Sequence, residues 1–278
     1  MENSPFYNQL LIEFSLTPTK SQHKLFSLLE NFTRHTGERD LFILRGYAGT
    51  GKTSSLGAYL KTLKSFNYKS KILAPTGRAA KVISLKAQEE AYTIHKQIYR
   101  RKSKIDLNSP VSLNINLHKN TVFVVDEASM IGSYTKDSSG SISNRNLLSD
   151  LFEYVYSGAG CKLILMGDDG QLPPVGSDSS PALDQKYLEH HYPQLKISAF
   201  KLDEVLRQSE ESEILLNATV LRSVDYQDIK LKTGGDLLRI GGVELQEELE
   251  SSYSNFGVEG TIVITRSINR QTSTINKL

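Results

Sequence analysis

The sequence predicts an α/β protein with an open, mostly parallel sheet and helices on both of its faces. Short apolar runs recur along the chain, at residues 41–44, 71–74, 121–125, 162–166 and 261–265. Most of these runs are apolar throughout, which is typical of parallel strands that are covered on both sides. After the first run, Leu56, Leu60 and Leu63 recur at helical spacing, so an amphipathic helix is expected there. Strands that alternate with helices indicate an α/β sheet.

The bulk composition is that of an ordinary globular protein. The 278 residues suffice for one large domain, or for one domain and part of another. A hydrophobic content of 38% and a charged content of 23% exclude an intrinsically disordered chain. The net charge of +2 is too small to indicate nucleic-acid binding by itself, so such a site has to arise from a local arrangement of charge.

Cysteine usage and hydropathy bear on the cellular location. Cys161 is the single cysteine, which excludes an internal disulfide and fits a reducing cytosol. No apolar run reaches the roughly 18 residues that a membrane-spanning helix needs, and the N-terminus lacks the basic-then-apolar pattern of a signal peptide. We therefore expect a cytoplasmic monomer with no membrane partner.

A phosphate-binding loop directly follows the first apolar run. Residues 46–53 match the pattern Gly-x-x-x-x-Gly-Lys-Ser/Thr, with a strand before it and a helix after it. Backbone N–H groups and the helix N-terminus can surround phosphate oxygens there. Lys52 can reach the β- and γ-phosphates of a nucleotide, and the Thr53 hydroxyl can hold Mg²⁺. The residues predicted to surround the nucleotide phosphates are Gly46, Ala48, Gly49, Thr50, Gly51, Lys52 and Thr53.

Two carboxylates follow the third apolar run. Asp126 comes directly after residues 121–125 and is suited to holding a metal ion, while the adjacent Glu127 is suited to activating water. Such an acid pair is common at strand ends, but an upstream phosphate loop makes the catalytic interpretation the favoured one.

Two further polar residues have two interpretations each. Gln171 follows the fourth run and could contact a γ-phosphate, or it could lie in a proline-fixed loop without a ligand; the residues alone favour neither. Arg207 lies where the character of the chain changes and could stabilise charge on a transferring phosphoryl group. A solvated surface arginine is the ordinary alternative.

The segment after the second run suits nucleic-acid phosphates. Pro75, Thr76 and Arg78 lie at a strand-to-helix junction, where a hydroxyl, cations and N–H groups could bind a backbone. The alternative is a capped helix with solvated cations. His95 could add a phosphate or stacking contact, although a lone histidine is more often structural.

The rest of the chain predicts the domain organisation. Residues 97–120 are basic and then turn-rich, which indicates a small insertion on the sheet, and residues 132–145 are rich in Ser and Gly, which indicates a loop. Residues 1–200 form the first predicted domain. From residue 201 to 278 the character differs, with a helical and then loop-like segment at residues 209–235.

Taken together, these motifs resemble those of superfamily 1 DNA helicases, in the branch of RecD-like, Pif1-like and Dda-like enzymes. The amino-acid sequences of residues 125–130 and 167–175 are the segments most specific to that branch. The other matching segments are residues 19–22, 46–53, 74–80, 93–95 and 206–208.

The resemblance implies a P-loop NTPase with a RecA-like parallel sheet and flanking helices, followed by the beginning of a second RecA-like domain. It implies ATP and Mg²⁺ as ligands, with Gln22 reading adenine, Gln171 coupling the γ-phosphate to bound DNA, and Arg207 acting as an arginine finger. Single-stranded DNA would follow a track along Pro75, Thr76, Arg78 and His95. The implied activity is an ATP-dependent helicase that translocates 5′ to 3′.

The chain also departs from that branch. Two later motifs, one near Thr-x-His-x-x-Gln-Gly and one near Thr-Arg-Ala, do not occur in it. Residues 261–276 resemble the early part of a second motor domain, so we expect a truncated second domain, weak hydrolysis and no unwinding. The alternatives are a P-loop ATPase switch that is not a helicase, and a nucleic-acid-binding module whose ATPase is vestigial. A small-molecule kinase is less favoured, since no lid-like arginine cluster follows the loop.

Overall fold

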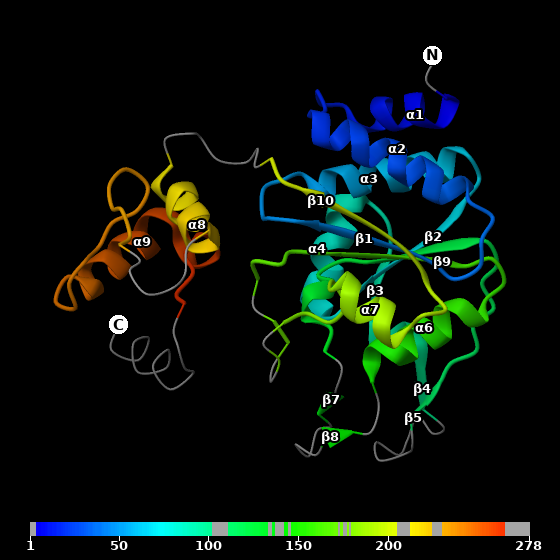
Figure 1. Cartoon of the computed structure of the whole chain (residues 1–278). Helices are drawn as coiled ribbons and strands as arrows, with labels where there is room; N and C mark the ends of the chain where they lie inside the picture. Colours follow the sequence, from blue (N-terminus) through cyan, green and yellow to red (C-terminus); the bar gives the residue numbers. More distant parts are fainter. Residues whose placement is uncertain are drawn as a thin grey trace. The chain divides into compact units, whose positions relative to one another are not determined.

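The computed structural model divides into two compact units, Met1–Gln208 and Ser209–Leu278 (Figure 1). The residues that it describes are 4–101, 111–132, 135–136, 142–143, 146–171, 173–174, 177, 179–204, 212–223 and 230–264. The division follows residue 208, whereas the sequence places the change of domain after residue 200.

The first unit is built on a six-stranded sheet whose strands are all parallel, in the order β10-β1-β9-β6-β2-β3. This confirms the predicted open parallel sheet. Its strands are β1 (Asp40–Gly46), β2 (Lys69–Ala74), β3 (Ala91–Thr93), β6 (Thr121–Val125), β9 (Lys162–Gly167) and β10 (Lys196–Leu202). Four of the predicted runs are therefore strands. The two edge strands, β3 and β10, were not predicted, because β3 is only three residues long and β10 is mostly half-buried and partly polar.

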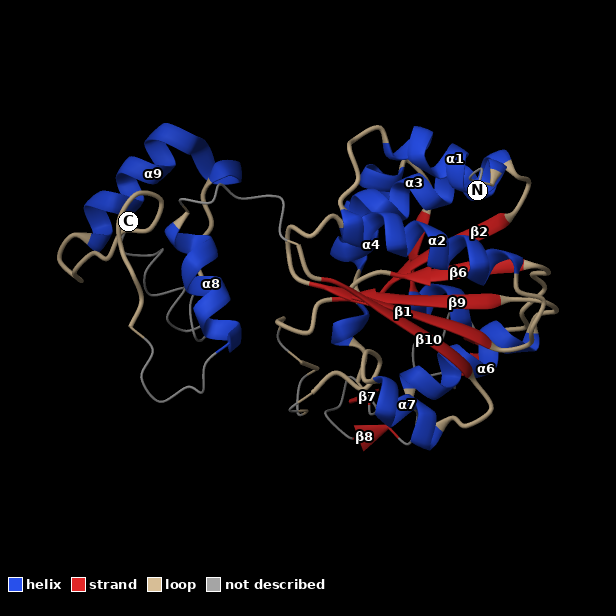
Figure 2. Ribbon diagram, turned by 45° about the horizontal axis from the view of Figure 1, so that its top comes forward, coloured by secondary structure: helices blue, strands red, loops and turns tan. Residues whose placement is uncertain are grey.

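Two layers of helices cover the sheet (Figure 2). One face carries α1 (Pro5–Phe14), α2 (Lys20–Arg34), α3 (Lys52–Ser65) and α4 (Gly77–Ala87), and the other carries α5 (Ile94–Ile98), α6 (Leu147–Ser157) and α7 (Gln185–His191). Side chains alternate between the faces of a strand. Leu44 of β1 therefore belongs to the core cluster that contains Leu56 and Leu60 of α3, whereas its neighbour Ile43 belongs to the cluster that contains Leu151 of α6. The helix predicted after the phosphate loop is confirmed as α3.

The helices α1 and α2, which were not predicted, begin with strong capping signals. Ser4 accepts a hydrogen bond from the Tyr7 N–H, and Pro5 opens the first turn of α1. At α2, Thr19 and Gln22 form a capping box, in which each side chain accepts from the backbone N–H of the other. These polar groups satisfy N–H groups that the first turn leaves without partners.

Two short antiparallel pairs of strands project from the first unit. β4 (Tyr99–Arg101) pairs with β5 (Val111–Leu113), within the segment predicted as an insertion. β7 (Thr135–Lys136) pairs with β8 (Ile142–Ser143), within the segment predicted as a loop. A one-turn 3₁₀ helix, η1 (Ala128–Met130), follows β6.

The second unit contains α8 (Glu213–Ser223) and α9 (Leu245–Gly260). The Asp236 carboxylate accepts hydrogen bonds from the N–H groups of Glu213 and Ile214 at the start of α8. The predicted strand at residues 261–265 is wrong for 261–264, which form none, and residue 265 lies outside the described part. Ile262 and Ile264 are 75% and 86% exposed, so an apolar run alone does not make a strand without a neighbour to pair with. In the described chain, no helix has both the length and the apolar character to cross a membrane.

Candidate nucleotide-binding site

The site is built where three neighbouring strands of the first unit end. In the register of the sheet, Leu44 of β1 lies opposite Met166 of β9, and Val125 of β6 lies opposite Leu165 of β9. The carboxyl ends of the three strands are therefore level. The phosphate loop, the pair Asp126–Glu127 and residues 168–171 leave the sheet at this one edge, where open α/β sheets bind their ligands.

The phosphate loop turns through glycines in left-handed backbone conformations. Gly49 has φ 85° and Gly51 has φ 84°, values that other residues adopt at a cost. Gly51 is the N-cap of α3, so no side chain covers the first N–H groups of that helix. Thr50 is buried, and its hydroxyl donates to the Tyr47 carbonyl oxygen at 2.9 Å, which fixes the turn.

Lys52 lies at the centre of the predicted site. Its ammonium group donates hydrogen bonds to the carbonyl oxygens of Gly46 and Tyr47, the latter at 2.9 Å. Burial raises the pKa of both Asp126 and Asp169, and the Lys52 charge opposes part of that rise. The structure therefore brings Lys52 close to carboxylates from the ends of β6 and β9, as the sequence predicts for Asp126.

Asp126 is half-buried. Burial and the adjacent Glu127 charge raise the pKa of Asp126 to about 6, although the Glu127 N–H, Lys52 and Lys86 oppose that shift. The Asp126 N–H donates to Leu73 O of β2 at 3.0 Å, so its backbone is tied to the sheet. Glu127 has φ 55°, a left-handed conformation that non-glycine residues rarely adopt and that is enriched at functional sites.

A tight turn after β9 positions Gln171. Asp168 accepts hydrogen bonds from the Gly170 N–H at 2.8 Å and, through its carbonyl, from the Gln171 N–H at 3.2 Å. The Gln171 side chain is exposed, and its Oε1 accepts a hydrogen bond from the Ser129 hydroxyl at 3.3 Å. The loops after β6 and β9 are thus joined by one side-chain contact.

The sequence reading missed four charged or aromatic residues at this edge. Arg45 of β1 lies 3.8 Å from Asp169, and Lys201 of β10 lies over the Tyr47 ring at 4.5 Å from its centroid and donates to its hydroxyl at 3.1 Å. Burial raises the pKa of Asp169, and Arg45, Lys201 and Lys52 oppose the rise. A signal was present for Arg45, because this charged residue directly follows the apolar run of residues 41–44 and stands immediately before the phosphate loop.

Gln22 lies beside the phosphate loop and is only 1% exposed. Its Oε1 accepts from the Thr19 N–H at 3.0 Å, and its Nε2 donates to Thr50 O at 3.4 Å. The role of Gln22 in reading adenine stays a prediction. That of Arg207 also stays a prediction, since Arg207 lies outside the described residues.

The residues predicted to bind nucleic acid lie at the same edge of the sheet, just after the ends of the neighbouring strands β2 and β3. Thr76 caps α4 by accepting from the Ala79 N–H, and Thr76 and Arg78 are exposed. Pro75 is half-buried between β2 and α4. His95 is exposed on α5, with its ring centroid 5.6 Å from that of Tyr99.

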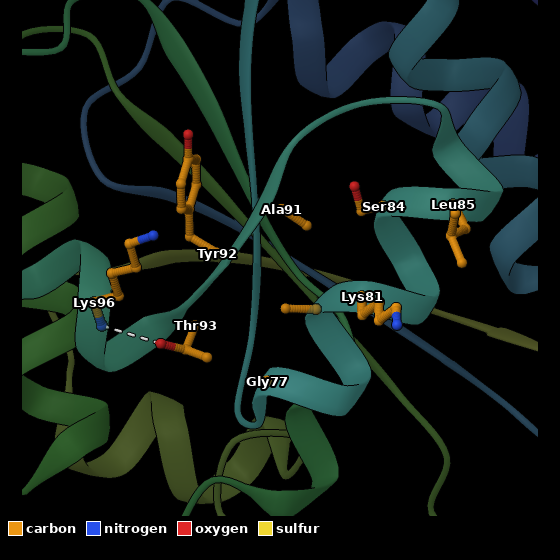
Figure 3. A pocket seen from close by; sticks show the side chains of 9 residues that line it. Gly77, Lys81, Ser84, Leu85, Ala91, Tyr92, Thr93 and Lys96 are labelled. Atoms are coloured by element: carbon orange, nitrogen blue, oxygen red, sulfur yellow. Dashed lines mark hydrogen bonds between the residues drawn. The ribbon is translucent and has the colours of Figure 1, made fainter.

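A hollow of about 340 Å³ lies between α4, β3 and α5 (Figure 3). Lys81 of α4 and Lys96 of α5 stand on its two walls, with Tyr92 and Thr93 on the β3 side. Lys96 Nζ is 4.9 Å from the centroid of the Tyr92 ring, and the backbone N–H of Lys96 donates a hydrogen bond to the Thr93 hydroxyl. The lining includes no carboxylate, so the hollow suits an anionic ligand.

Comparison with known families agrees with this site. A family model described as "AAA domain" matches residues 29–234, which is more than half of the chain and includes the phosphate loop and both carboxylates. The chain belongs to the AAA domain family. The predicted fold class, a P-loop NTPase with a parallel sheet and flanking helices, is thereby confirmed; the predicted start of a second RecA-like domain stays a prediction.

Relatives of this AAA domain chain include two uncharacterized proteins. One, from Methanocaldococcus jannaschii, is 32% identical over 208 residues, which are 68% of this chain and 16% of that protein. The other, from Acanthamoeba polyphaga mimivirus, is 28% identical over 236 residues, which are 76% of this chain and 42% of that protein. The chain thus spans less than half the length of each. Among solved structures, the Pif1 helicase from Candida albicans has a TM-score of 0.48 at 16% identity, over 93% of this chain and 61% of that one.

Proposed function

We propose that this chain binds ATP with Mg²⁺ at the carboxyl edge of its sheet and couples ATP hydrolysis to movement along single-stranded DNA, as a superfamily 1 DNA helicase. The observation that carries the proposal is the convergence of three loops around Lys52. Beside them, the adjoining strands β2 and β3 are each followed by a helix with a capped N-terminus, α4 and α5. Translocation from 5′ to 3′ is part of the proposal and rests on the resemblance of the motifs.

In this proposal the phosphate loop holds the nucleotide. Lys52 exchanges the carbonyl oxygens of Gly46 and Tyr47 for the β- and γ-phosphate oxygens, while the N–H groups at the start of α3 donate to the same phosphates. The Thr53 hydroxyl and the Asp126 carboxylate are hard oxygen donors of the kind that Mg²⁺ prefers, so they fit that ion together with phosphate oxygens. Mg²⁺, when bound, would neutralise charge on the transferring phosphoryl group.

Glu127 would accept the proton of the attacking water. Its left-handed backbone lets the chain turn sharply after β6, so Glu127 lies at the strand end next to Asp126. Gln171 follows β9, the strand between β1 and β6, and would also contact the γ-phosphate. A group that contacts the γ-phosphate can distinguish ATP from ADP, which a motor requires.

Single-stranded DNA would lie along the starts of α4 and α5. Thr76, Arg78 and His95 offer a hydroxyl, a guanidinium group and an imidazole there, and Lys81 and Lys96 line the adjacent hollow. Because β2 lies directly beside β6, the DNA track would adjoin the strand that carries Asp126 and Glu127. This adjacency gives a short route for coupling between DNA and ATP.

The first test is ATP hydrolysis by the chain with and without single-stranded DNA. We expect weak hydrolysis that increases when DNA is added and is abolished by Lys52→Ala. Hydrolysis that is lost in Lys52→Ala but does not respond to DNA would instead support a P-loop ATPase switch. DNA binding without any effect of nucleotide would support a nucleic-acid-binding module with a vestigial ATPase.

The second test is the salt dependence of DNA affinity. The double variant Lys81→Gln with Lys96→Gln should reduce the slope of log K against log salt by about 1.4, because each lost phosphate contact accounts for about 0.7 on single strands. Lys186→Gln is the matched control, since Lys186 is exposed on α7, which covers the other face of the sheet from α4. An equal slope in all three proteins would contradict the DNA track. We also propose that the protein is a cytoplasmic monomer. Analytical ultracentrifugation, which measures the mass of the particle in solution, tests the monomeric state.

A further inference from the structure

Ser129 is buried at a point where two loops of the nucleotide site meet. It lies in η1, two residues after Glu127, and is 1% exposed. The end of β9 approaches Ser129 so closely that a Cβ atom added to Gly167 would lie 3.0 Å from the Ser129 backbone N atom. Its hydroxyl group contacts Gln171 Oε1 at 3.3 Å.

The direction of this hydrogen bond follows from burial. A serine hydroxyl group has one proton to donate, and a buried donor without an acceptor is unfavourable. Among the described residues, Gln171 Oε1 is the one hydrogen-bond partner of the Ser129 hydroxyl. If the Gln171 amide were turned over, its NH₂ group would donate to Ser129 Oγ, and the hydroxyl proton would have no acceptor in the described structure. Ser129 therefore donates, and Gln171 accepts through Oε1.

This assignment decides which group of Gln171 is left for a ligand. The Gln171 side chain is exposed, so in the absence of a restraint its amide would turn freely in water. With Oε1 committed to Ser129, the Nε2 group stays available as a donor. A γ-phosphate offers only acceptor oxygens, so a donor is the group that it requires, and the opposite orientation would present an oxygen to an anion.

We infer that Ser129 is a positioning residue that fixes the Gln171 amide so that its NH₂ group faces the γ-phosphate, and that it thereby sets the preference for ATP over ADP. The inference rests on the proposed function, since it requires a nucleotide in the phosphate loop. Ser129 itself does not touch the nucleotide.

Equilibrium binding of two nucleotides tests the inference. Dissociation constants for ADP and for the non-hydrolysable analogue AMPPNP are measured with Mg²⁺ for the unaltered chain, Ser129→Ala, Gln171→Ala and the double variant. We expect Ser129→Ala to weaken the preference for AMPPNP by about 2- to 10-fold, the effect of no longer ordering one side chain. ADP affinity should change by less than about twofold, since ADP has no γ-phosphate.

The double variant separates a positioning role from a structural one. If Ser129 acts through Gln171, the double variant should match Gln171→Ala alone. Ser55→Ala is the matched control, because Ser55 is also fully buried beside the phosphate loop, but its hydroxyl has no hydrogen-bond partner in the described structure. It should leave both affinities unchanged.

Each contrary result has a distinct meaning. An unchanged preference in Ser129→Ala would overturn the inference alone, as would a further loss in the double variant or an equal loss of ADP affinity. If the unaltered chain bound both nucleotides equally well, Gln171 would not read the γ-phosphate and the inference would again fail. The proposed function, and the inference with it, would fail if the unaltered chain bound neither nucleotide. They would also fail if Lys52→Ala bound both nucleotides as tightly as the unaltered chain does.

Discussion

Replacement of Lys162 by methionine should be among the most destabilising single changes in the first unit. Lys162 opens β9 and is only 8% exposed, and its ammonium group donates to the carbonyl oxygens of Phe32, Thr33 and His35 at the end of α2. It also lies 3.6 Å from the Asp40 carboxylate, which is buried. Burial lowers the pKa of Lys162, and Asp40 opposes that shift, so the charge is held by these partners.

The expected cost follows from what the substitution leaves behind. Methionine keeps the aliphatic stem of the side chain, so little packing is lost. Three carbonyl oxygens at the end of α2 lose a charged donor, and removing one partner of a buried pair costs about 3–5 kcal/mol. His35 Nδ1 still contacts Asp40 at 2.8 Å, so the lower end of that range, about 3 kcal/mol, is expected.

Urea unfolding followed by circular dichroism measures this change in the free energy of unfolding. Lys186→Met is the control, since an exposed lysine on α7 should change that free energy by no more than about 0.5 kcal/mol. The double variant Lys162→Met with Asp40→Asn should recover part of the loss, because the carboxylate charge is then gone. A loss below about 1 kcal/mol in Lys162→Met would refute the reasoning, as it would show that the contacts are not held in solution.

Three further predictions concern single hydrogen bonds and one backbone conformation. Gly51→Ala should weaken nucleotide binding and lower the free energy of unfolding by about 1–2 kcal/mol, because φ is 84° at Gly51 and a Cβ atom there would come within 2.5 Å of Gln22 Nε2. Gly57→Ala is the control, since a Cβ atom at Gly57 meets nothing within 4 Å. Asn116→Ala should cost about 2–3 kcal/mol in urea unfolding, because the buried Asn116 amide donates to Tyr154 O and Val155 O at the end of α6; a loss under about 0.5 kcal/mol would contradict this. Thr33→Val should lower the free energy of unfolding by about 1 kcal/mol more than Tyr59→Phe, because it leaves the buried Tyr59 hydroxyl group without its partner. In Tyr59→Phe the Thr33 hydroxyl group still donates to Leu29 O, so equal losses in the two variants would count against this assignment.

The interior of the sheet could be predicted from sequence because burial there is complete. Every residue of β6 and β9 is buried, so these strands are apolar runs with sharp polar ends. The same reasoning missed β10, since an edge strand has one neighbour and keeps polar residues, and it predicted a strand at residues 261–264, where no pairing partner is found among the described residues. Hydropathy reports the need for burial, whereas a strand also requires a partner for its backbone groups.

The candidate site could be predicted only where a motif lies in one continuous segment. Residues 46–53 form such a segment, so the loop and its lysine, Lys52, can be located from the sequence. The contact between Ser129 and Gln171 joins residues 42 positions apart, and that between Lys162 and Phe32 joins residues 130 positions apart. Both depend on the order of the strands in the sheet, which no local pattern specifies.

The strand order also explains why so many charges lie together at one edge. Because β1, β6 and β9 are almost entirely buried, their charged residues can lie only at or beyond the strand ends. Parallel pairing then brings Asp126, Asp169 and Lys52 to the same edge, where the lysine stabilises both carboxylates. A sheet of antiparallel strands would divide these ends between two edges. The parallel arrangement that the apolar runs predict is therefore also the cause of the concentrated, nearly balanced charge that a nucleotide site requires.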